Sequence, residues 1–548
     1  MQKNIAGRCN VKKILGYDKL RGGYYTPKAI ADFISRWAIH NPNDTILEPS
    51  CGDGSFIQSV KSVFQERGYT NAPRMIGVEL DPVEAEKASS HGAAIENEDF
   101  FTYYTENILD KKSFDVIVGN PPFIRSQNFD EVYRKKAFSL MEKVGLHPNR
   151  LTNIWIPFLV LSTCALAPDG RLGMVIPAEV MQVDYAAEIR QYLSNAYDSL
   201  TIITFKKLLF PKAQQEVVLL LGEKTSRRKG VRTIEVMDAS SLTDLDIYDS
   251  AYEVKDLDHS TEKWTQYYLS GDEIALLRRL RSDNRIALTT TLFDVNVGIV
   301  SGENDFFLLN ATTKDQYGLG TESTIPIVGR AEQLKGINFS EGDFNALAAT
   351  ERKMFLFAPK DVDYEQLTPE EKSYADYGSE AGYNKGYKCR IRKHWYVVPK
   401  TWRADAFMLR QVNKYPRIVY NATLAQNTDT LHKIRFKENV DGHCVAAAFL
   451  NSFTLAMCEI IGRSYGGGVL TFEPGEVRKL KVPMLGSDEL DFELIDRLAK
   501  ENRIAEILEY TDGILLEKHL KLTHEEILLL RGIWERLSER RIGRKKEK

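Results

Sequence analysis

The residues with the clearest chemical potential are Asn120, Pro121, Pro122 and Phe123, which follow the apolar segment 114–119. Two consecutive prolines fix two φ angles and remove two backbone donors, so this turn is stiff. The Asn120 side-chain carbonyl and the Pro121 backbone carbonyl can accept from both N–H groups of one amine, beside the flat face of Phe123. Such acceptors favour a more tetrahedral nitrogen, which suits methyl transfer to the poorly nucleophilic amine of adenine or cytosine. A proline turn with a packed ring would leave the amide unexplained.

Three further segments place polar residues where a strand is expected to end. The first is the glycine-rich turn LEPSCGDGSF at 47–56, where small residues let a ligand approach the backbone. Glu79 follows the next strand, where a carboxylate can accept from two ribose hydroxyls. Asp99 and Phe100 follow the third, where an acid could hold an exocyclic adenine amine. Each feature alone fits an ordinary turn, helix cap or solvated acid, but four in succession indicate one ligand site.

Alternating strand-like and helix-like segments must position these side chains. This alternation predicts an α/β fold with a parallel sheet covered on both faces, and the last two strands look like a hairpin. From about residue 255 the pattern becomes mixed, and from about residue 491 it is strongly helical. We expect domains at 1–240, 241–490 and 491–548. The strands are expected at 44–49, 74–80, 93–100, 114–120, 171–177, 200–205 and 216–222, and the main helices at 54–68, 81–92 and 153–170.

Composition narrows the class of protein. The chain has 548 residues, a net charge of −3 and six scattered cysteines without a Cys-x-x-Cys pair, which argues against a zinc site or a disulfide framework. We find no apolar run long enough to span a bilayer and no signal-like apolar stretch near the start. We therefore expect a cytoplasmic protein that does not bind membranes.

The chain resembles the gamma class of DNA adenine-N6 methyltransferases, the TaqI-like and Eco57I-like enzymes of bacterial restriction–modification systems. The resemblance covers roughly residues 20 to 221 and has the motif order of that family. The segment 23–34, which resembles the family's N-terminal motif, lies before the glycine-rich turn, and this motif order favours the gamma class over the beta class. Asn rather than Ser at the start of NPPF favours adenine over cytosine as the substrate. The segments that carry the resemblance are GYYTPKAIADFI (23–34), EPSCGDG (48–54), ELD (79–81), Asp99-Phe100, NPPF (120–123), Phe158 and LFPKAQQEVVLLL (209–221).

The resemblance implies a Rossmann-like class I methyltransferase fold that uses S-adenosylmethionine, releases S-adenosylhomocysteine and needs no metal. Thr26 would lie near the methionine part, Glu48 near its amine, Glu79 on the ribose, Leu80 against the cofactor's adenine ring, and Asp99 on its adenine amine. Phe123 and Phe210 would stack on the flipped target base, although an aromatic in a hairpin is by itself more often core. Further cofactor contacts are implied for Pro49, Ser50, Cys51, Gly52, Phe100, Asn120, Pro122 and Phe158.

Two positions depart from the common pattern of the family. Phe123 replaces Tyr, which loses a hydroxyl but keeps the stacking face. Glu48 replaces Asp, which changes reach but not charge. We therefore expect the ring of residue 123, rather than a phenolic hydroxyl, to serve the base pocket.

The C-terminal half carries an uneven charge distribution. Residues 385–417 contain ten Lys or Arg and one acid, Asp405. An amine inside a duplex is out of reach, so the base must leave the stack, and a second, mixed α/β target-recognition domain ending in helices should hold the DNA. A solvated face with aromatics turned to the core is the alternative. The predicted DNA contacts are Lys388, Arg390, Arg392, Lys393, Trp395 and Arg403.

The leading hypothesis is a monomeric, site-specific methyltransferase acting on the N6 amine of a flipped-out adenine in double-stranded DNA. A cognate restriction endonuclease acting on the same site is a possible partner. The alternatives are an RNA or protein-glutamine methyltransferase, or a DNA-specificity subunit without its own activity. The recognition sequence and the base-reading residues are not predicted.

Overall fold

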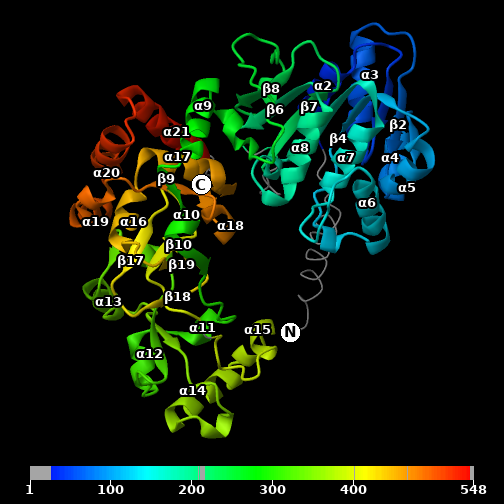
Figure 1. The fold of residues 1–548 in the computed structure, drawn as a ribbon. Helices are drawn as coiled ribbons and strands as arrows, with labels where there is room; N and C mark the ends of the chain where they lie inside the picture. The colour runs from blue at the N-terminus through cyan, green and yellow to red at the C-terminus, as the bar shows by residue number, and fades with distance from the viewer. Residues whose placement is uncertain (1–25, 208, 210–215, 400, 466, 544–548) are drawn as a thin grey trace. The chain divides into compact units, whose positions relative to one another are not determined.

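The computed structural model describes residues 26–207, 209, 216–399, 401–465 and 467–543 (Figure 1). They form two compact units, the first ending at Gly271 and the second beginning at Asp272. The functional boundaries expected at residues 240 and 490 stay predictions.

Unit 1 is built on an eight-stranded sheet with the order β3-β2-β1-β4-β5-β7-β6-β8 (Figure 1). Strands β1 to β5 run parallel, and β7 lies antiparallel between β5 and β6. The predicted hairpin is thus confirmed, and β8 adds a parallel edge strand beside β6. The strands are β1 (Thr45–Glu48), β2 (Arg74–Val78), β3 (Ala94–Glu96), β4 (Phe114–Gly119), β5 (Leu166–Pro177), β6 (Ser199–Phe205), β7 (Val217–Glu223) and β8 (Gly230–Val236).

Helices cover both faces of this sheet, as the alternating pattern predicted. Ile46, Val116 and Val118 share a buried cluster with α2 and α3, and the intervening strand residues face the opposite side. Helix α2 lies so close to β5 that a Cβ on Gly173 would come within 2.5 Å of the Ile34 side chain. The helices are α2 (Lys28–Ala38), α3 (Ser55–Glu66), α4 (Pro82–Ser89), α5 (Phe100–Tyr103), α6 (Glu131–Lys143), α7 (Trp155–Ala165) and α8 (Ala187–Ala196).

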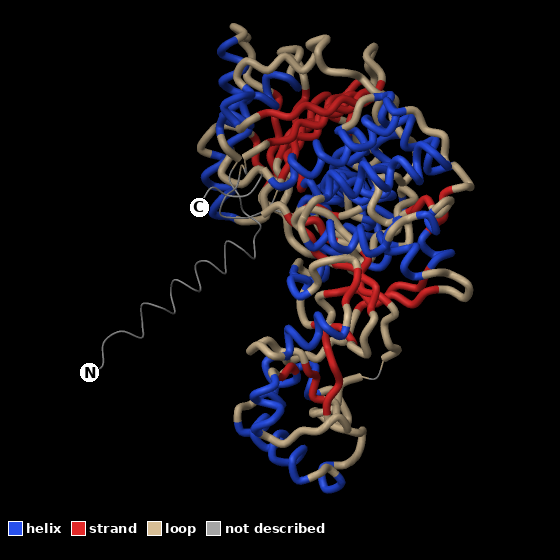
Figure 2. The backbone as a smooth tube through the Cα atoms, turned by 90° about the vertical axis from the view of Figure 1, so that its left-hand side faces the viewer, coloured by secondary structure: helices blue, strands red, loops and turns tan. Residues whose placement is uncertain are grey.

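Unit 2 contains several smaller sheets. Its five-stranded sheet has the order β10-β19-β15-β17-β13, with β10 (Phe293–Val297) antiparallel to β19 (Leu431–Phe436). A second sheet, β11-β14-β12-β18, supports a lobe with its own aromatic core, which lies at one end of the unit (Figures 1 and 2). The other strands of these two sheets are β11 (Leu308–Leu309), β12 (Thr324–Val328), β13 (Asn338–Phe339), β14 (Phe355–Phe357), β15 (Ala406–Leu409), β17 (Ile418–Asn421) and β18 (Gln426–Asn427).

Short strands and helices complete unit 2. The smaller sheets pair β16 (Gln411–Val412), β21 (Val469–Thr471) and β20 (Arg463–Tyr465), and separately β22 (Lys481–Pro483) and β9 (Ile286–Leu288). The helices before the terminal group are α9 (Gly271–Ser282), α10 (Thr289–Leu292), α11 (Asn304–Phe307), α12 (Ala311–Gln316), α13 (Glu341–Ala348), α14 (Pro369–Glu380), α15 (Tyr387–Arg390), α16 (Gly442–Ala448), α17 (Ser452–Ile461) and α18 (Pro474–Val477).

The terminal helices α19 (Phe492–Lys500), α20 (Ile504–Asp512) and α21 (His524–Ile542) pack into unit 2. Arg541 of α21 forms a buried ion pair with Glu459 of α17, with 2.6 Å between Nη2 and Oε1. Arg531 likewise reaches the buried carboxylate of Asp512 at 3.0 Å. These contacts hold α21 against α17 and α20 within unit 2.

Within the described residues, no single helix has the length and apolar composition needed to cross a membrane. The bent pair of α16 and α17 passes that test only when the two are joined, and most of their residues are buried inside unit 2.

Candidate functional site

The four predicted strand-end features meet at one edge of the unit 1 sheet. Glu48 ends β1, Glu79 follows β2, Asp99 lies three residues after β3, and Asn120 follows β4. These strands are neighbours in the order β3-β2-β1-β4 and all run parallel, so their carboxyl ends lie side by side. The arrangement is the one in which open α/β sheets bind ligands.

Glu48 is a buried carboxyl group with unfilled acceptor capacity. It is 2% exposed, and its Oε2 has no hydrogen-bond partner among the described residues. Burial, reinforced by the negative charges of Glu79 and Asp53, raises the pKa of Glu48 well above its ordinary value. A cationic ammonium group beside Glu48 would restore the ionised form, because an opposite charge at contact distance favours the carboxylate.

Glu79 is held in place by the glycine-rich turn. The Gly52 N–H, in a left-handed conformation with φ 51°, donates to Glu79 Oε2 at 2.9 Å, and the Asp81 N–H donates to Oε1 at 2.8 Å. Burial raises the pKa of Glu79, and these two donors partly oppose the rise. Each carboxylate oxygen can accept more than one hydrogen bond. Beside it, Leu80 is 46% exposed and offers an apolar surface.

Asp99 both caps a helix and lies at the site. Its Oδ2 accepts from the N–H and the hydroxyl of Thr102, at 2.9 and 3.0 Å, at the start of α5. Burial raises the pKa of its carboxyl group. The next residue, Phe100, stacks on Phe158 of α7 with ring centroids 5.1 Å apart and an interplanar angle of 16°. The two predicted aromatic contacts therefore form one buried pair.

The turn that carries Asn120 is fixed on both sides. The Ser50 hydroxyl donates to the Asn120 backbone carbonyl at 3.4 Å, and a Cβ on Gly119 would contact Pro49 at 3.4 Å. Pro121 is buried, and Phe123 is partly buried against the core under α2 and α3.

Residues outside the predicted set hold the far side of this turn. The Ile154 N–H donates to the Ile124 carbonyl at 3.0 Å, and Arg125 pairs with Asn153 in an isolated antiparallel bridge. The start of α7 thus positions the segment after Phe123. In the sequence, the one sign of this positioning role is that Asn153 stands directly before an apolar helix.

Two predicted residues, Thr26 just before α2 and Phe210 in the segment between β6 and β7, have different outcomes. Thr26 is 8% exposed and lies next to Pro27, the N-cap of α2. Phe210 lies outside the described residues, so its stacking role stays a prediction. Cys51, in the glycine-rich turn, is buried, and its N–H donates to the Val78 carbonyl at 3.0 Å.

The predicted DNA contacts of unit 2 fall into two kinds. Lys388, Arg390 and Lys393 are exposed. Arg392 donates to the carbonyls of Val300 and Ser301, at 3.0 and 2.6 Å.

The remaining two predicted contacts also have partners inside the protein. Arg403 donates to the Thr423 carbonyl at 2.8 Å. Trp395 packs against Phe306 with ring centroids 4.9 Å apart, in the aromatic core of the lobe. Of the six predicted contacts, Lys388, Arg390, Lys393 and Arg403 are exposed, whereas Arg392 and Trp395 are partly buried.

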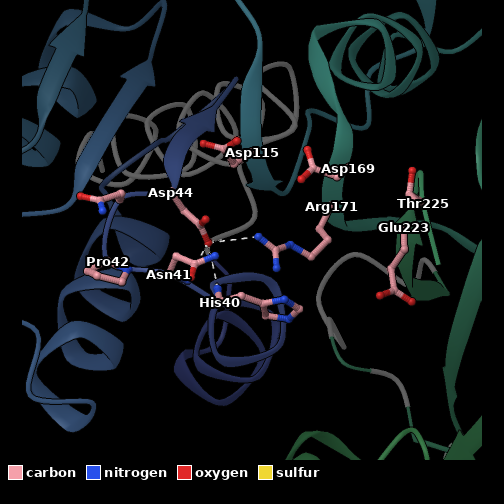
Figure 3. A pocket seen from close by; sticks show the side chains of 10 residues that line it. His40, Asn41, Pro42, Asp44, Asp115, Asp169, Arg171, Glu223 and Thr225 are labelled. Carbon is pink, nitrogen blue, oxygen red and sulfur yellow. Dashed lines mark hydrogen bonds and ion pairs between the residues drawn. The ribbon is translucent and has the colours of Figure 1, made fainter. Parts of the chain in front are cut away.

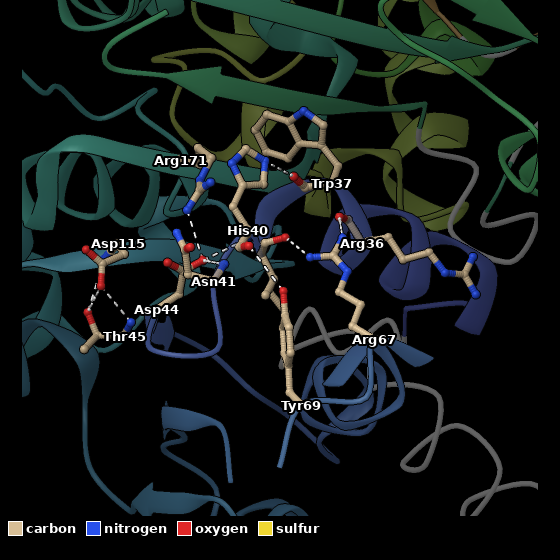
Figure 4. Close-up of polar contacts among 11 residues, drawn as sticks. Arg36, Trp37, His40, Asn41, Asp44, Thr45, Arg67, Tyr69, Asp115 and Arg171 are labelled. Carbon is tan, nitrogen blue, oxygen red and sulfur yellow. Dashed lines mark hydrogen bonds and ion pairs between the residues drawn. The ribbon is translucent and has the colours of Figure 1, made fainter. Parts of the chain in front are cut away.

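A polar cavity of ≈520 Å³ lies at the opposite, amino-terminal edge of the parallel strands (Figure 3). Asp44 accepts there from Arg171 Nη2 at 3.0 Å and from the N–H groups of His40 and Asn41 at 2.8 and 3.1 Å (Figure 3). The neighbouring loop is held by the Tyr69 hydroxyl, which donates to the His40 carbonyl at 3.2 Å (Figure 4). These contacts join α2, β1 and β5 and give this edge a structural role.

Comparison with known proteins identifies the family. The family model "N-6 DNA Methylase" matches residues 16–275, and the model "Type II methyltransferase M.Eco57I, C-terminal domain" matches residues 261–516. The chain belongs to the N6-adenine DNA methyltransferases. This confirms the prediction of an N6-adenine DNA methyltransferase with site-specific activity, whereas its placement in the gamma class stays a prediction. The predicted fold, a class I methyltransferase domain followed by a mixed C-terminal domain, is also confirmed.

Similar curated proteins extend over most of this methyltransferase. M.AccI of Acinetobacter calcoaceticus, a type II methyltransferase, is 24% identical over 528 residues, which cover 91% of this chain and 94% of the relative. M.XamI of Xanthomonas campestris pv. amaranthicola is 23% identical over 485 residues, 85% of each chain. The DrdV–DNA complex aligns with a TM-score of 0.53 and 11% identity over 91% of this chain and 59% of the DrdV chain, a likeness of fold. The fold and family imply S-adenosylmethionine as the methyl donor.

Proposed function

We propose that this methyltransferase is of the gamma class and transfers a methyl group from S-adenosylmethionine to the N6 amine of an adenine rotated out of double-stranded DNA. The observation that carries the proposal is the meeting of Glu48, Glu79, Asp99 and Asn120 at four neighbouring strand ends. Glu48, Glu79 and Asp99 match the ammonium group, the ribose and the adenine amine of the cofactor, in that order. Asn120 follows the neighbouring strand β4, where the target amine would receive the methyl group.

The residues present fit the cofactor. The orphaned Oε2 of buried Glu48 suits the cofactor's ammonium group. Glu79, fixed by two backbone donors, suits the ribose hydroxyls, and Leu80 the adenine ring. Asp99 is assigned to the exocyclic amine of that ring. Supporting contacts are assigned to Thr26, Pro49, Ser50, Cys51, Gly52, Phe100, Pro122 and Phe158.

The chemistry needs positioning rather than acid or base groups. S-adenosylmethionine supplies a methyl group bound to a positively charged sulfur. The Asn120 side-chain carbonyl and the Pro121 carbonyl accept from the two N–H groups of the target amine, which directs the nitrogen lone pair at that methyl group. Phe123 stacks on the adenine ring, and Phe210 is assigned to its other face.

The partner follows from the substrate. Double-stranded DNA binds the protein, with the exposed Lys388, Arg390 and Lys393 of unit 2 among the candidate phosphate contacts. Arg392 and Trp395 would support that segment from within, and the exposed Arg403 would be held beside it by its hydrogen bond to the Thr423 carbonyl. We further propose a monomer in the bacterial cytoplasm and a cognate endonuclease that cuts the same site.

Methyl-group transfer to defined substrates tests the proposal. Tritium from labelled S-adenosylmethionine should enter duplex DNA, and digestion of the product should yield N6-methyladenine. Asn120→Ala should lower the rate of transfer by about 10²–10³-fold while the variant keeps its fold. Label found only in RNA or in protein would favour the alternative substrates, and unchanged transfer by Asn120→Ala would remove the assigned role of that amide.

A further inference from the structure

A cationic cluster lies on one face of the five-stranded sheet of unit 2, outside the segment predicted to bind DNA. In the antiparallel pair of β10 and β19, Asn296 faces Lys433 and Asp294 faces Arg435. Because side chains alternate along a strand, Lys433 and Arg435 project from the same face. Two positively charged side chains are therefore neighbours on one face of β19.

Trp402 packs over both of these cations. The Lys433 ammonium lies 4.5 Å from the centroid of the Trp402 ring, and the Arg435 guanidinium lies 4.6 Å from it. An aromatic face stabilises a nearby cation, but for the buried Lys433 this offsets only part of the cost of burial. Trp402 thus holds the two cations together without neutralising them.

Neither cation has an anionic partner in the described part of the chain. Lys433 is 5% exposed, and the structure gives its ammonium no carboxylate and no hydrogen-bond acceptor. Burial, and then the charge of Arg435, lowers the pKa of Lys433. The neighbouring carboxylate of Asp294 is already bound to Lys437 at 2.7 Å. A buried cation without a counter-ion is costly, and an external anion would relieve that cost.

A cavity of ≈270 Å³ opens beside the ring, and its lining includes Trp402, Arg435 and Arg478 together with Asp294, the acid that pairs with Lys437. Arg478 is oriented by one hydrogen bond, from Nη2 to the Val295 carbonyl at 3.1 Å. The volume lies below the roughly 300–1,000 Å³ of pockets that enclose small organic ligands. Two guanidinium groups on the wall suit a phosphate group, since Arg binds phosphate through paired N–H donors, and the Lys433 ammonium lies near the same ring, 4.5 Å from its centroid.

We infer that Trp402, Lys433, Arg435 and Arg478, the Trp402 cluster, bind a backbone phosphate of the DNA substrate. The inference rests on the proposed function, because DNA supplies the phosphate. Arg435 and Arg478 contact the phosphate oxygens, Lys433 adds positive charge close to them, and Trp402 packs on Lys433 and Arg435 and so fixes their positions. Such a contact fixes the position of the duplex on unit 2 without reading its sequence.

The salt dependence of DNA binding tests this inference. The full-length protein and the variants Arg435→Met and Lys433→Met are titrated with a fluorescent duplex at a series of NaCl concentrations. Each variant should bind about tenfold more weakly at ~0.1 M salt, on duplexes of any sequence. The slope of log K against log [salt] should fall by about 0.9, because the variant neutralises one phosphate fewer. Lys314→Met is the matched control, because Lys314 also lies over a ring, Phe355 at 5.5 Å, in the same unit.

Unchanged slopes in variants that keep the wild-type circular dichroism would overturn the inference. Inorganic phosphate provides a second arm. If it raises the Tm of the wild type but not of Arg435→Met, while the DNA slopes of the two proteins agree, the site holds a small anion and the DNA assignment is wrong. Methyl transfer by the wild type is measured in parallel, so a failure of the proposed activity appears as absent transfer and is distinct from a failure of the phosphate site.

Discussion

The hydroxyl of Ser50 donates to the backbone carbonyl of Asn120 at 3.4 Å, joining the turn after β1 to the turn after β4. The first turn belongs to the assigned cofactor site and the second to the assigned amine site. The contact therefore sets the distance between the two turns across neighbouring parallel strands. Pro49, which lies against Gly119, reinforces the same contact through packing.

We expect Ser50→Ala to lower methyl transfer much less than Asn120→Ala. The hydrogen bond that Ser50→Ala removes is long and worth at most about 1 kcal/mol, which corresponds to a decrease in kcat of about fivefold. Removal of an acceptor on the reacting amine should lower kcat by about 10²–10³-fold, as for other preorganised polar groups at a reacting centre. Single-turnover methyl transfer measures both. Equal losses in the two variants would show that Ser50 acts on the amine as directly as Asn120.

Glu48→Gln should stabilise the protein without cofactor and weaken cofactor binding. Burial and two nearby acids raise the pKa of Glu48 in the folded state, so the folded protein retains a proton that the unfolded chain releases. Stability is consequently lost as pH rises above the ordinary pKa of glutamate, and the amide removes this loss. The Tm of Glu48→Gln should exceed that of the wild type at pH 8, and the two should converge near pH 4.

Calorimetric titration with S-adenosylmethionine completes the test of Glu48. The variant should bind the cofactor at least about tenfold more weakly, because the amide cannot form an ion pair with the ammonium. Gln58→Glu is a suitable control for a carboxyl–amide exchange, since the Gln58 side chain on α3 contacts His91 at 3.0 Å in an exposed position. Tighter cofactor binding by Glu48→Gln would contradict the assignment.

The ring of Phe123 should matter more than any hydroxyl at this position. Phe123→Tyr keeps the stacking face, and we expect its kcat/KM to stay within about threefold of the wild-type value. Phe123→Ala removes base stacking worth about 1–3 kcal/mol, so kcat/KM should fall by about 5- to 150-fold. A duplex with 2-aminopurine at the target position, once modification-sensitive sequencing has given the site, should show less fluorescence change with Phe123→Ala. An unaffected alanine variant would exclude a stacking role.

The features of the site that could be predicted from the sequence are those formed by residues close together in the chain. The ends of β1 to β4 were predictable because each combines an apolar strand with a polar residue directly after it. The burial of Glu48, and the lack of a hydrogen-bond donor for its Oε2 among the described residues, could not be predicted, because both depend on packing by segments that are distant in the sequence. The segment 385–403 shows the same limit, since Trp395 lies in an aromatic core and Arg392 binds backbone carbonyls. Trp402, Lys433 and Arg435 come together only through the fold.

The amino-terminal edge of the sheet should control stability rather than activity. Asp44 accepts from Arg171 and from two backbone N–H groups, and both side chains are nearly buried, with 6% and 10% exposed. Asp44→Asn would leave the Arg171 guanidinium buried without its counter-ion, which costs about 3–5 kcal/mol. Denaturant unfolding should show this loss, whereas methyl transfer by the folded fraction should keep the wild-type kcat, because the edge lies opposite Asn120. Lys28→Gln, which breaks an exposed ion pair with Asp32, is the control and should change stability by less than about 1 kcal/mol. A large loss of kcat in folded Asp44→Asn would show that this edge takes part in the reaction.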